Sequence, residues 1–196
     1  MRQMVSLMLV LGGLTVGCAD ESGDERSNDS PSAQVLDAGA SVPCVAGKTA
    51  SAVIEARSAN TTLKGTLRIA KEGSTTKLTL KVTGAPPGPR GAHIHATGDC
   101  SAADATSAGG HWNPAMVNHG MPGATPSHLG DLGNFTVAED GTGTLELTNP
   151  AWTIGDGAAT DVVGKAIIVH GGVDDFTTQP TGNAGGRIGC GVIKLD

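Results

Sequence analysis

Apolar and polar residues alternate over short stretches of this chain, and a period of two residues predicts strands rather than helices. In the stretch 76–84, Leu78, Leu80 and Val82 fall on one face of the predicted strand, and lysines and threonines fall on the other. Further strands are predicted over 49–57, 62–70, 91–96, 133–147 (a hairpin), 164–171 and 189–195. With turns at Ser-Ala-Asn (58–60) and Glu-Asp-Gly-Thr (139–142), about eight short strands result, which predicts an all-β, antiparallel barrel or sandwich.

Two stretches, 96–132 and 171–189, lack this alternation and are rich in Gly, Pro, Asp and Thr. We call them the first and the second long loop. Loops of this length inside a compact domain are usually either functional or disordered. We therefore expect the chemistry of the protein to lie in them.

Residues 1–17 have the pattern of an export signal, because Arg2 supplies a positive charge and the apolar run that follows is too short to span a membrane. Cys18 ends this run after small residues, which resembles a bacterial lipoprotein signal and predicts a lipid on Cys18; an ordinary secretory signal is the alternative. Residues 18–43 hold six acidic residues and almost nothing apolar, which predicts a disordered acidic tether. The globular domain is then expected over 44–196.

The charge distribution argues against nucleic acid as a partner. The formal net charge is −6, and the range 91–196 holds eleven acidic residues against three cations. The whole chain contains two tryptophans, two phenylalanines and no tyrosine. Neither a basic binding face nor a set of aromatic stacking platforms is expected from this composition. The core has to be built from Val, Ile, Leu and Ala.

The six histidines all lie between positions 93 and 170. In "GAHIHATGDC" (91–100), His93 and His95 would share one face of a strand, either as surface polar residues or as metal ligands. Imidazole suits copper and zinc, and imidazole with carboxylate suits zinc. Together with Asp131 in "HLGDLGN", the candidate ligands number seven, which exceeds one tetrahedral site and matches two metal sites that share an imidazole.

Six motifs in a fixed order make the chain resemble a known family. They are "GAHIHATGDC", "SAGGHWNP", "NHGMP", "HLGDLGN", "VHGGVDD" and "TGNAGGRIGCGVI". The motifs resemble those of the Cu/Zn superoxide dismutases, and in detail those of the exported bacterial members. The resemblance implies an eight-stranded antiparallel Greek-key barrel or sandwich with two long functional loops. It also implies bound copper and zinc cations, superoxide as the substrate, and dismutation to oxygen and hydrogen peroxide.

The resemblance further assigns residues to the two metals. Those that match the copper ligands are His93, His95, His111 and His170. Those that match the zinc ligands are His111, His119, His128 and Asp131. His111 would therefore bridge the two metals as an imidazolate and take up a proton during catalysis.

Other matched residues would support the site. Asp174 matches a carboxylate that hydrogen-bonds one ligand of each metal, and Thr181 matches a threonine that narrows the channel. Arg187 matches the catalytic cation that guides the anion toward copper. Cys100 and Cys190 match a disulfide, which leaves Cys44 free or paired between chains.

Two functions stay open on this basis, an enzyme and a surface-tethered copper or zinc buffer on the same fold. Arg187 favours the enzyme, because a buffer has no need of a cation in an anion-handling loop. The expected location is a bacterial cell envelope, in the periplasm or at the cell surface, with membrane attachment only through the lipid on Cys18. A homodimer is compatible with the family, although the sequence shows no hydrophobic patch for one.

Overall fold

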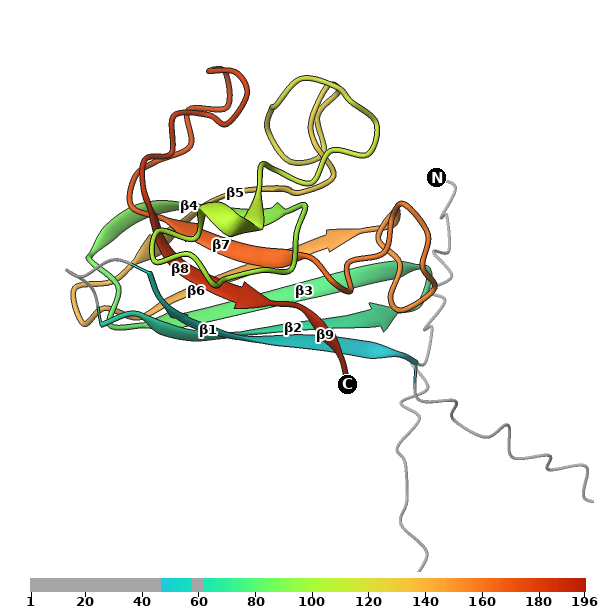
Figure 1. Cartoon of the computed structure of the whole chain (residues 1–196), viewed down its shortest axis with the longest axis horizontal. Helices are drawn as coiled ribbons and strands as arrows, with labels where there is room; N and C mark the ends of the chain where they lie inside the picture. The colour runs from blue at the N-terminus through green and yellow to red at the C-terminus, as the bar shows by residue number, and fades with distance from the viewer. Residues whose placement is uncertain (1–46, 58–61) are drawn as a thin grey trace, which may run out of the picture. The chain divides into compact units, whose positions relative to one another are not determined.

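The computed structural model describes residues 47–57 and 62–196, and within these ranges it consists of strands, loops and one short 3₁₀ turn, η1 (Thr106–Ala108) (Figure 1). The strands are β1 (Thr49–Ala56), β2 (Lys64–Glu72), β3 (Thr75–Thr83), β4 (Gly88–His95), β5 (Asp131–Val137), β6 (Gly143–Asn149), β7 (Ala166–His170), β8 (Arg187–Val192) and β9 (Lys194–Leu195). No helix in the described part of the chain has the length and apolar character of a membrane span.

The strands close into a barrel. From β1 the hydrogen-bonded order is β2, β3, β6, β5, β4, β7 and β8, and β8 pairs with β1 again. The short β9 follows β8 after Ile193 and also pairs with β1. Because β3 neighbours β6 and β4 lies between β5 and β7, the order is that of a Greek key. The expected all-β, eight-stranded antiparallel barrel is confirmed.

The barrel has two narrow seams where few residues pair. At one seam β5 meets β6 through Val137 and Gly143, and at the other β1 meets β8 through two residue pairs that include Ala56 and Gly189. A Cβ on Gly189 would lie 2.7 Å from a methyl carbon of Leu63. Glycine at this position therefore leaves room for the buried side chain of Leu63.

The core fills the barrel as the composition predicts. The largest fully buried side chains are Trp152, Ile54, Leu63, Leu67, Ile69, Leu78, Leu80, Ile94, Leu132, Ile167, Ile168 and Ile193. All but Trp152 are aliphatic. Along β2 and β3, Leu67, Ile69, Leu78 and Leu80 alternate with polar residues that are exposed or half-buried. Trp152 adds an indole N–H, which donates to the carbonyl of Leu129 at 3.0 Å and so ties the end of the first long loop to the barrel.

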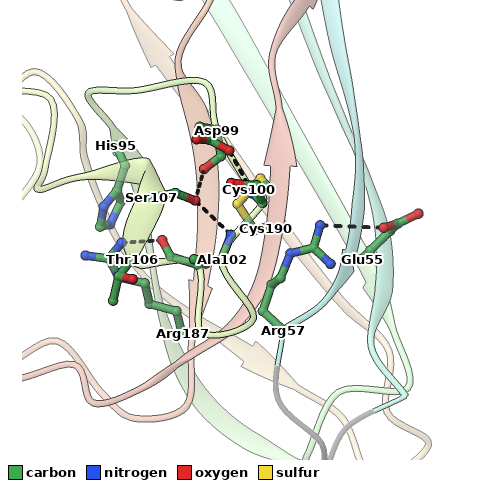
Figure 2. Close-up of a disulfide and its surroundings, with 12 residues drawn as sticks. Glu55, Arg57, His95, Asp99, Cys100, Ala102, Thr106, Ser107, Arg187 and Cys190 are labelled. Atoms are coloured by element: carbon green, nitrogen blue, oxygen red, sulfur yellow. Dashed lines mark hydrogen bonds and ion pairs between the residues drawn. A yellow bond between two sulfur atoms is a disulfide. The ribbon is translucent and has the colours of Figure 1, made fainter.

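The outer face of β7 and β8 is buried as well, because the first long loop covers it. Ala166 and Ile168 of β7 pack with Ala105, Ala108 and the disulfide cysteines in a small separate cluster. The disulfide joins Cys100 of the loop to Cys190 of β8, with Cα atoms 5.9 Å apart (Figure 2). The pairing expected from the family resemblance is therefore confirmed.

The two long loops end earlier than the sequence predicts. Asp131 opens β5 and Arg187 opens β8, whereas both were assigned to loops. Each pairs with a histidine across a register shift, Asp131 with His93 and Arg187 with His170, and the sequence pattern contains no sign of these irregular pairs. β4 begins at Gly88, three residues before the strand predicted over 91–96. Both loops extend from one side of the barrel (Figure 1).

Several predictions fall on residues that the structure does not describe. The signal peptide 1–17, the lipid on Cys18, the tether 18–43, Cys44 and the turn 58–60 all lie outside the described residues. The turn 139–142 is described and forms as predicted, with Asp140 accepting hydrogen bonds from Thr142.

Replacing both disulfide cysteines, as in Cys100→Ala with Cys190→Ala, should lower the free energy of unfolding by about 3–5 kcal/mol. The bond closes a loop with a sequence separation of 90, so its removal restores chain entropy to the unfolded state. Denaturant unfolding of the oxidised wild type and the double variant measures the difference. Equal stability of the two proteins would show that the bond does not constrain the unfolded chain.

Candidate metal centre

Strand β4 presents two histidines on the outer face of the barrel. Ile94 points into the core, and the flanking His93 and His95 are 0% and 1% exposed beneath the long loops. His170, the last residue of the neighbouring β7, lies beside them, with its ring centroid 4.9 Å from that of His93. The predicted shared face of His93 and His95 is therefore confirmed, and the reading of them as exposed surface residues is wrong.

The first long loop returns alongside β4 and brings a further histidine to this face. The N–H of Ala96 donates to the carbonyl of Gly110 at 2.9 Å, and the N–H of Trp112 donates to that of Ile94 at 2.8 Å. His111, between these two contacts, stacks on His93 with a centroid distance of 3.9 Å. Backbone pairing, rather than side-chain packing alone, thus sets the position of His111.

Seven buried side chains form two clusters that share one residue. The first cluster consists of His93, His95, His111 and His170. The second cluster consists of His111, His119, His128 and Asp131. Within each cluster the candidate ligand atoms all lie within 4.8 Å of one another. These are the two sets that the family resemblance assigns to copper and zinc.

In the first cluster, protein acceptors hold one ring nitrogen of three histidines and leave the other nitrogen free. His95 Nδ1 lies 2.9 Å from the carbonyl of Gly109, and His170 Nδ1 lies 3.2 Å from that of Gly185. His93 instead uses Nε2, which lies 2.8 Å from Asp174. A hydrogen on each of these nitrogens leaves a lone pair on the opposite one.

Among the described residues, the buried ring nitrogens without a hydrogen-bond partner are those that face the clusters. They are His93 Nδ1, His95 Nε2, His111 Nε2, His119 Nδ1, His128 Nδ1 and His170 Nε2. Of these, His119 Nδ1 and His128 Nδ1 lie 3.0 and 3.3 Å from the Asp131 carboxylate, close enough for an ion pair but without the geometry of a hydrogen bond. Buried polar atoms normally have a partner. A bound cation would satisfy these atoms, so the residues fit the metals that the family implies.

The second cluster is centred on one carboxylate oxygen. Asp131 Oδ1 lies 2.9, 3.0 and 3.3 Å from Nδ1 of His111, His119 and His128, respectively. Its Oδ2 accepts the backbone N–H groups of His128 and Gly120. Burial alone would raise the pKa of Asp131, but the hydrogen bonds from His111 and the two N–H groups outweigh it and lower the pKa to about 2. Asp131 is therefore ionised and oriented.

Asp174 connects the two clusters without belonging to either. Its Oδ2 holds His93 Nε2 at 2.8 Å and its Oδ1 holds His119 Nε2 at 2.9 Å, as the family resemblance implies. The side-chain amide of Asn134 brackets the backbone of Asp174 with two hydrogen bonds of 2.8 Å. Burial opposes ionisation of Asp174, but these imidazoles and the N–H of Phe176 lower its pKa. A side chain larger than hydrogen at Gly182 would overlap the Asp174–His119 contact.

Arg187 lies beside the first cluster and holds the first long loop. Its two terminal nitrogens donate to the carbonyls of Ala105 at 2.6 Å and Gly109 at 2.7 Å, next to Thr106 in Figure 2. The Gly109 carbonyl is the same one that orients His95. Burial lowers the pKa of Arg187, but a guanidinium remains charged in proteins.

A cavity of about 400 Å³ reaches the histidines from outside. Its lining includes His111, His128, Gln179 and Thr181, whereas Arg187 is not part of it. Thr181 thus lies at an opening toward His111 and His128, whereas its expected role in narrowing a channel stays a prediction. The sequence gives no sign of the roles of Asn134 and Gln179, because their contacts span 40 and 60 residues and leave no periodic signal. The close approach of Gly182 to Asp174 and His119 is likewise evident only from the structure.

Comparison with known proteins gives the family. The family model described as copper/zinc superoxide dismutase (SODC) matches residues 63–193. A solved structure titled "Crystal Structure Analysis of the clock protein EA4" is similar, with 32% sequence identity and a TM-score of 0.66. The match covers 76% of this chain and 95% of that one. With the matched range spanning most of the barrel and all seven clustered residues, the chain belongs to the copper/zinc superoxide dismutase family.

Proposed function

We propose that the chain catalyses the dismutation of superoxide to oxygen and hydrogen peroxide, with copper in the first cluster and zinc in the second. Membership of the copper/zinc superoxide dismutase family supports this reaction. The observation that carries the proposal is that His111 belongs to both clusters. Its Nδ1 lies 2.9 Å from Asp131, and its Nε2 has no hydrogen-bond partner among the described residues. A protein that only stored one ion would have no need of this shared imidazole.

Three imidazoles of the first cluster, those of His93, His95 and His170, have lowered pKa values, which favour the protonation state that binds metals. Burial lowers the pKa of His95 to about 2 and that of His170 to about 3. Burial also lowers the pKa of His93, although its hydrogen bond to Asp174 acts in the opposite direction. Neutral imidazole is the form that ligates copper and zinc.

The metals and the chain would divide the chemistry between them. Copper bound here would exchange the electrons of the two half-reactions, and zinc, which has no redox chemistry, would fix His111 and the first long loop. One superoxide loses an electron to become oxygen, and a second gains an electron and two protons to become hydrogen peroxide. His111 Nε2 has no hydrogen-bond partner in the described part of the chain and can hold one of these protons. Arg187 supplies positive charge next to His170.

His128→Ala should remove zinc and leave copper in place, because the first cluster keeps all four of its histidines. Elemental analysis after reconstitution with both metals should give about one copper and one zinc per wild-type chain, and about one copper alone in the variant. Asp140→Asn, which changes an exposed carboxylate in the β5–β6 turn, serves as the control and should bind both metals. Wild-type protein that holds one kind of metal at one site would contradict the proposal. Protein that holds both metals but consumes no superoxide would favour the buffer.

The metal-free protein should lose stability as the pH falls from about 6.5 toward 3. Below pH 6.5 the unfolded chain protonates His95 and His170, whereas the folded state excludes those protons, so each pH unit costs about 1.4 kcal/mol per histidine. His119 has the opposite effect on stability, because Asp174 and Asp131 outweigh burial and raise its pKa. It is a single histidine, whereas the pKa values of His93, His95 and His170 are all lowered. Denaturant unfolding between pH 8 and 4 measures the slope, and His95→Gln should make it shallower. A stability that is flat across this range would contradict the burial of neutral imidazoles.

Arg187 should matter both as a charge and as an anchor. Arg187→Ala should lower catalytic efficiency at least about tenfold, and Arg187→Lys should recover part of the loss, since it keeps the charge but not the two-pronged contact. The wild-type rate should fall with ionic strength, because salt screens the approach of the anion. Metal content is measured in parallel, since Arg187 also holds the carbonyl that orients His95.

Lys194→Ala is the matched control for Arg187, because it removes an exposed cation from β9 and should leave the rate nearly unchanged. Undiminished activity of Arg187→Ala, or a rate that rises with ionic strength, would show that the anion is guided from elsewhere.

A further inference from the structure

The second long loop contributes no residue to the second cluster in the described part of the chain, yet three of its hydrogen bonds converge on one member of that cluster, His119. Asp174 Oδ1 holds the ring at Nε2, at 2.9 Å. The side-chain amide of Gln179 holds the backbone, since Oε1 accepts the His119 N–H at 2.8 Å and Nε2 donates to the His119 carbonyl at 2.9 Å. His119 is therefore fixed at its ring and at both of its backbone polar groups.

A closed turn presents Gln179 to His119. The N–H of Asp175 donates to the Gly182 carbonyl at 2.8 Å, and the N–H of Gly182 donates to the Thr178 carbonyl at 2.7 Å. The carboxylate of Asp175 accepts the N–H and the hydroxyl of Thr178, which braces the turn from inside. Asp175 therefore stabilises the turn, a role that the sequence alone does not indicate.

Gln179 has no packing role that would account for its place. The residue is exposed, so its side chain adds little to the apolar core. Apart from a longer contact of 3.3 Å to the Thr177 carbonyl, its amide hydrogen bonds both go to His119. The side-chain amide of Gln179 thus pairs with both the N–H and the carbonyl of His119, as the backbone of a neighbouring strand would.

We propose that Gln179 is a positioning residue that sets how firmly the second cluster holds its divalent cation. Asp174 fixes the rotation of the His119 ring, and Gln179 fixes the backbone from which the ring extends. Together they keep His119 Nδ1 directed at Asp131 Oδ1, 3.0 Å away. Loss of such supporting contacts typically lowers metal affinity about 10- to 100-fold. The inference rests on the proposed function, because it takes the second cluster to be a metal site.

The test uses Co²⁺ as a probe of the second cluster in the full-length protein with Cu²⁺ already in the first. Visible absorption reports the coordination of Co²⁺, and competition with a chelator gives its affinity. Gln179→Ala removes both contacts to His119, and Gln179→Glu keeps the acceptor but loses the donor. Thr177→Val is the control, because it removes a hydroxyl hydrogen bond from the same loop without touching His119.

We expect Gln179→Ala to weaken Co²⁺ binding about tenfold or more, with an altered absorption spectrum, while the Cu²⁺ spectrum of the first cluster and the Thr177→Val protein stay as in the wild type. Gln179→Glu should also weaken Co²⁺ binding, because it loses the hydrogen bond that Gln179 donates to the His119 carbonyl. Unchanged Co²⁺ affinity in Gln179→Ala would overturn the inference. Equal weakening of both metals, or of Thr177→Val, would also overturn it by showing general loosening of the loop. Wild-type protein that binds no Co²⁺ at the second cluster would refute the proposed function itself, and the inference with it.

Discussion

The burial of two carboxylates among six imidazoles, outside the barrel and beneath two loops, is the constraint on which this structure depends. Buried charges are costly unless they are paired. Asp131 is paired at both oxygens, since Oδ2 accepts backbone N–H groups and Oδ1 lies against imidazoles. The two oxygens of Asp174 contact His93 of the first cluster and His119 of the second. The pairing is incomplete, because ring nitrogens in both clusters have no hydrogen-bond partner among the described residues. A cation bound to them would stabilise the loops and the fold together.

Much of the fold and of the site was predictable because it rests on local patterns. Alternation located the strands, and the spacing of His93 and His95 placed both rings on one face of β4. The two clusters of candidate ligands were predicted from the order of motifs that the family resemblance rests on. The limits of the long loops were not predictable, because Asp131 and Arg187 belong to strands only through pairing with histidines far away in sequence. Register shifts at these pairs have no signature in the local sequence.

The supporting contacts of the site were hidden for the same reason. Asn134 and Gln179 each use one side-chain amide to bracket a backbone residue on another segment, Asp174 and His119, respectively. Arg187 was recognisable as a charge, whereas its hold on the Gly109 carbonyl required the structure. A loss of activity in a variant of Arg187 therefore combines lost charge with a loosened His95. Sequence spacing located the residues that gather in the two clusters, whereas it gave no sign of the groups that orient them.

The central claim is that His111 belongs to both clusters at once. The measurement that tests it most directly is low-temperature electron paramagnetic resonance of the protein loaded with Cu²⁺ in both clusters. A shared imidazolate couples the two unpaired spins, so the account predicts the spectrum of a coupled pair, and His111→Ala should abolish the coupling. Two independent, uncoupled Cu²⁺ signals in the wild-type protein would contradict the account.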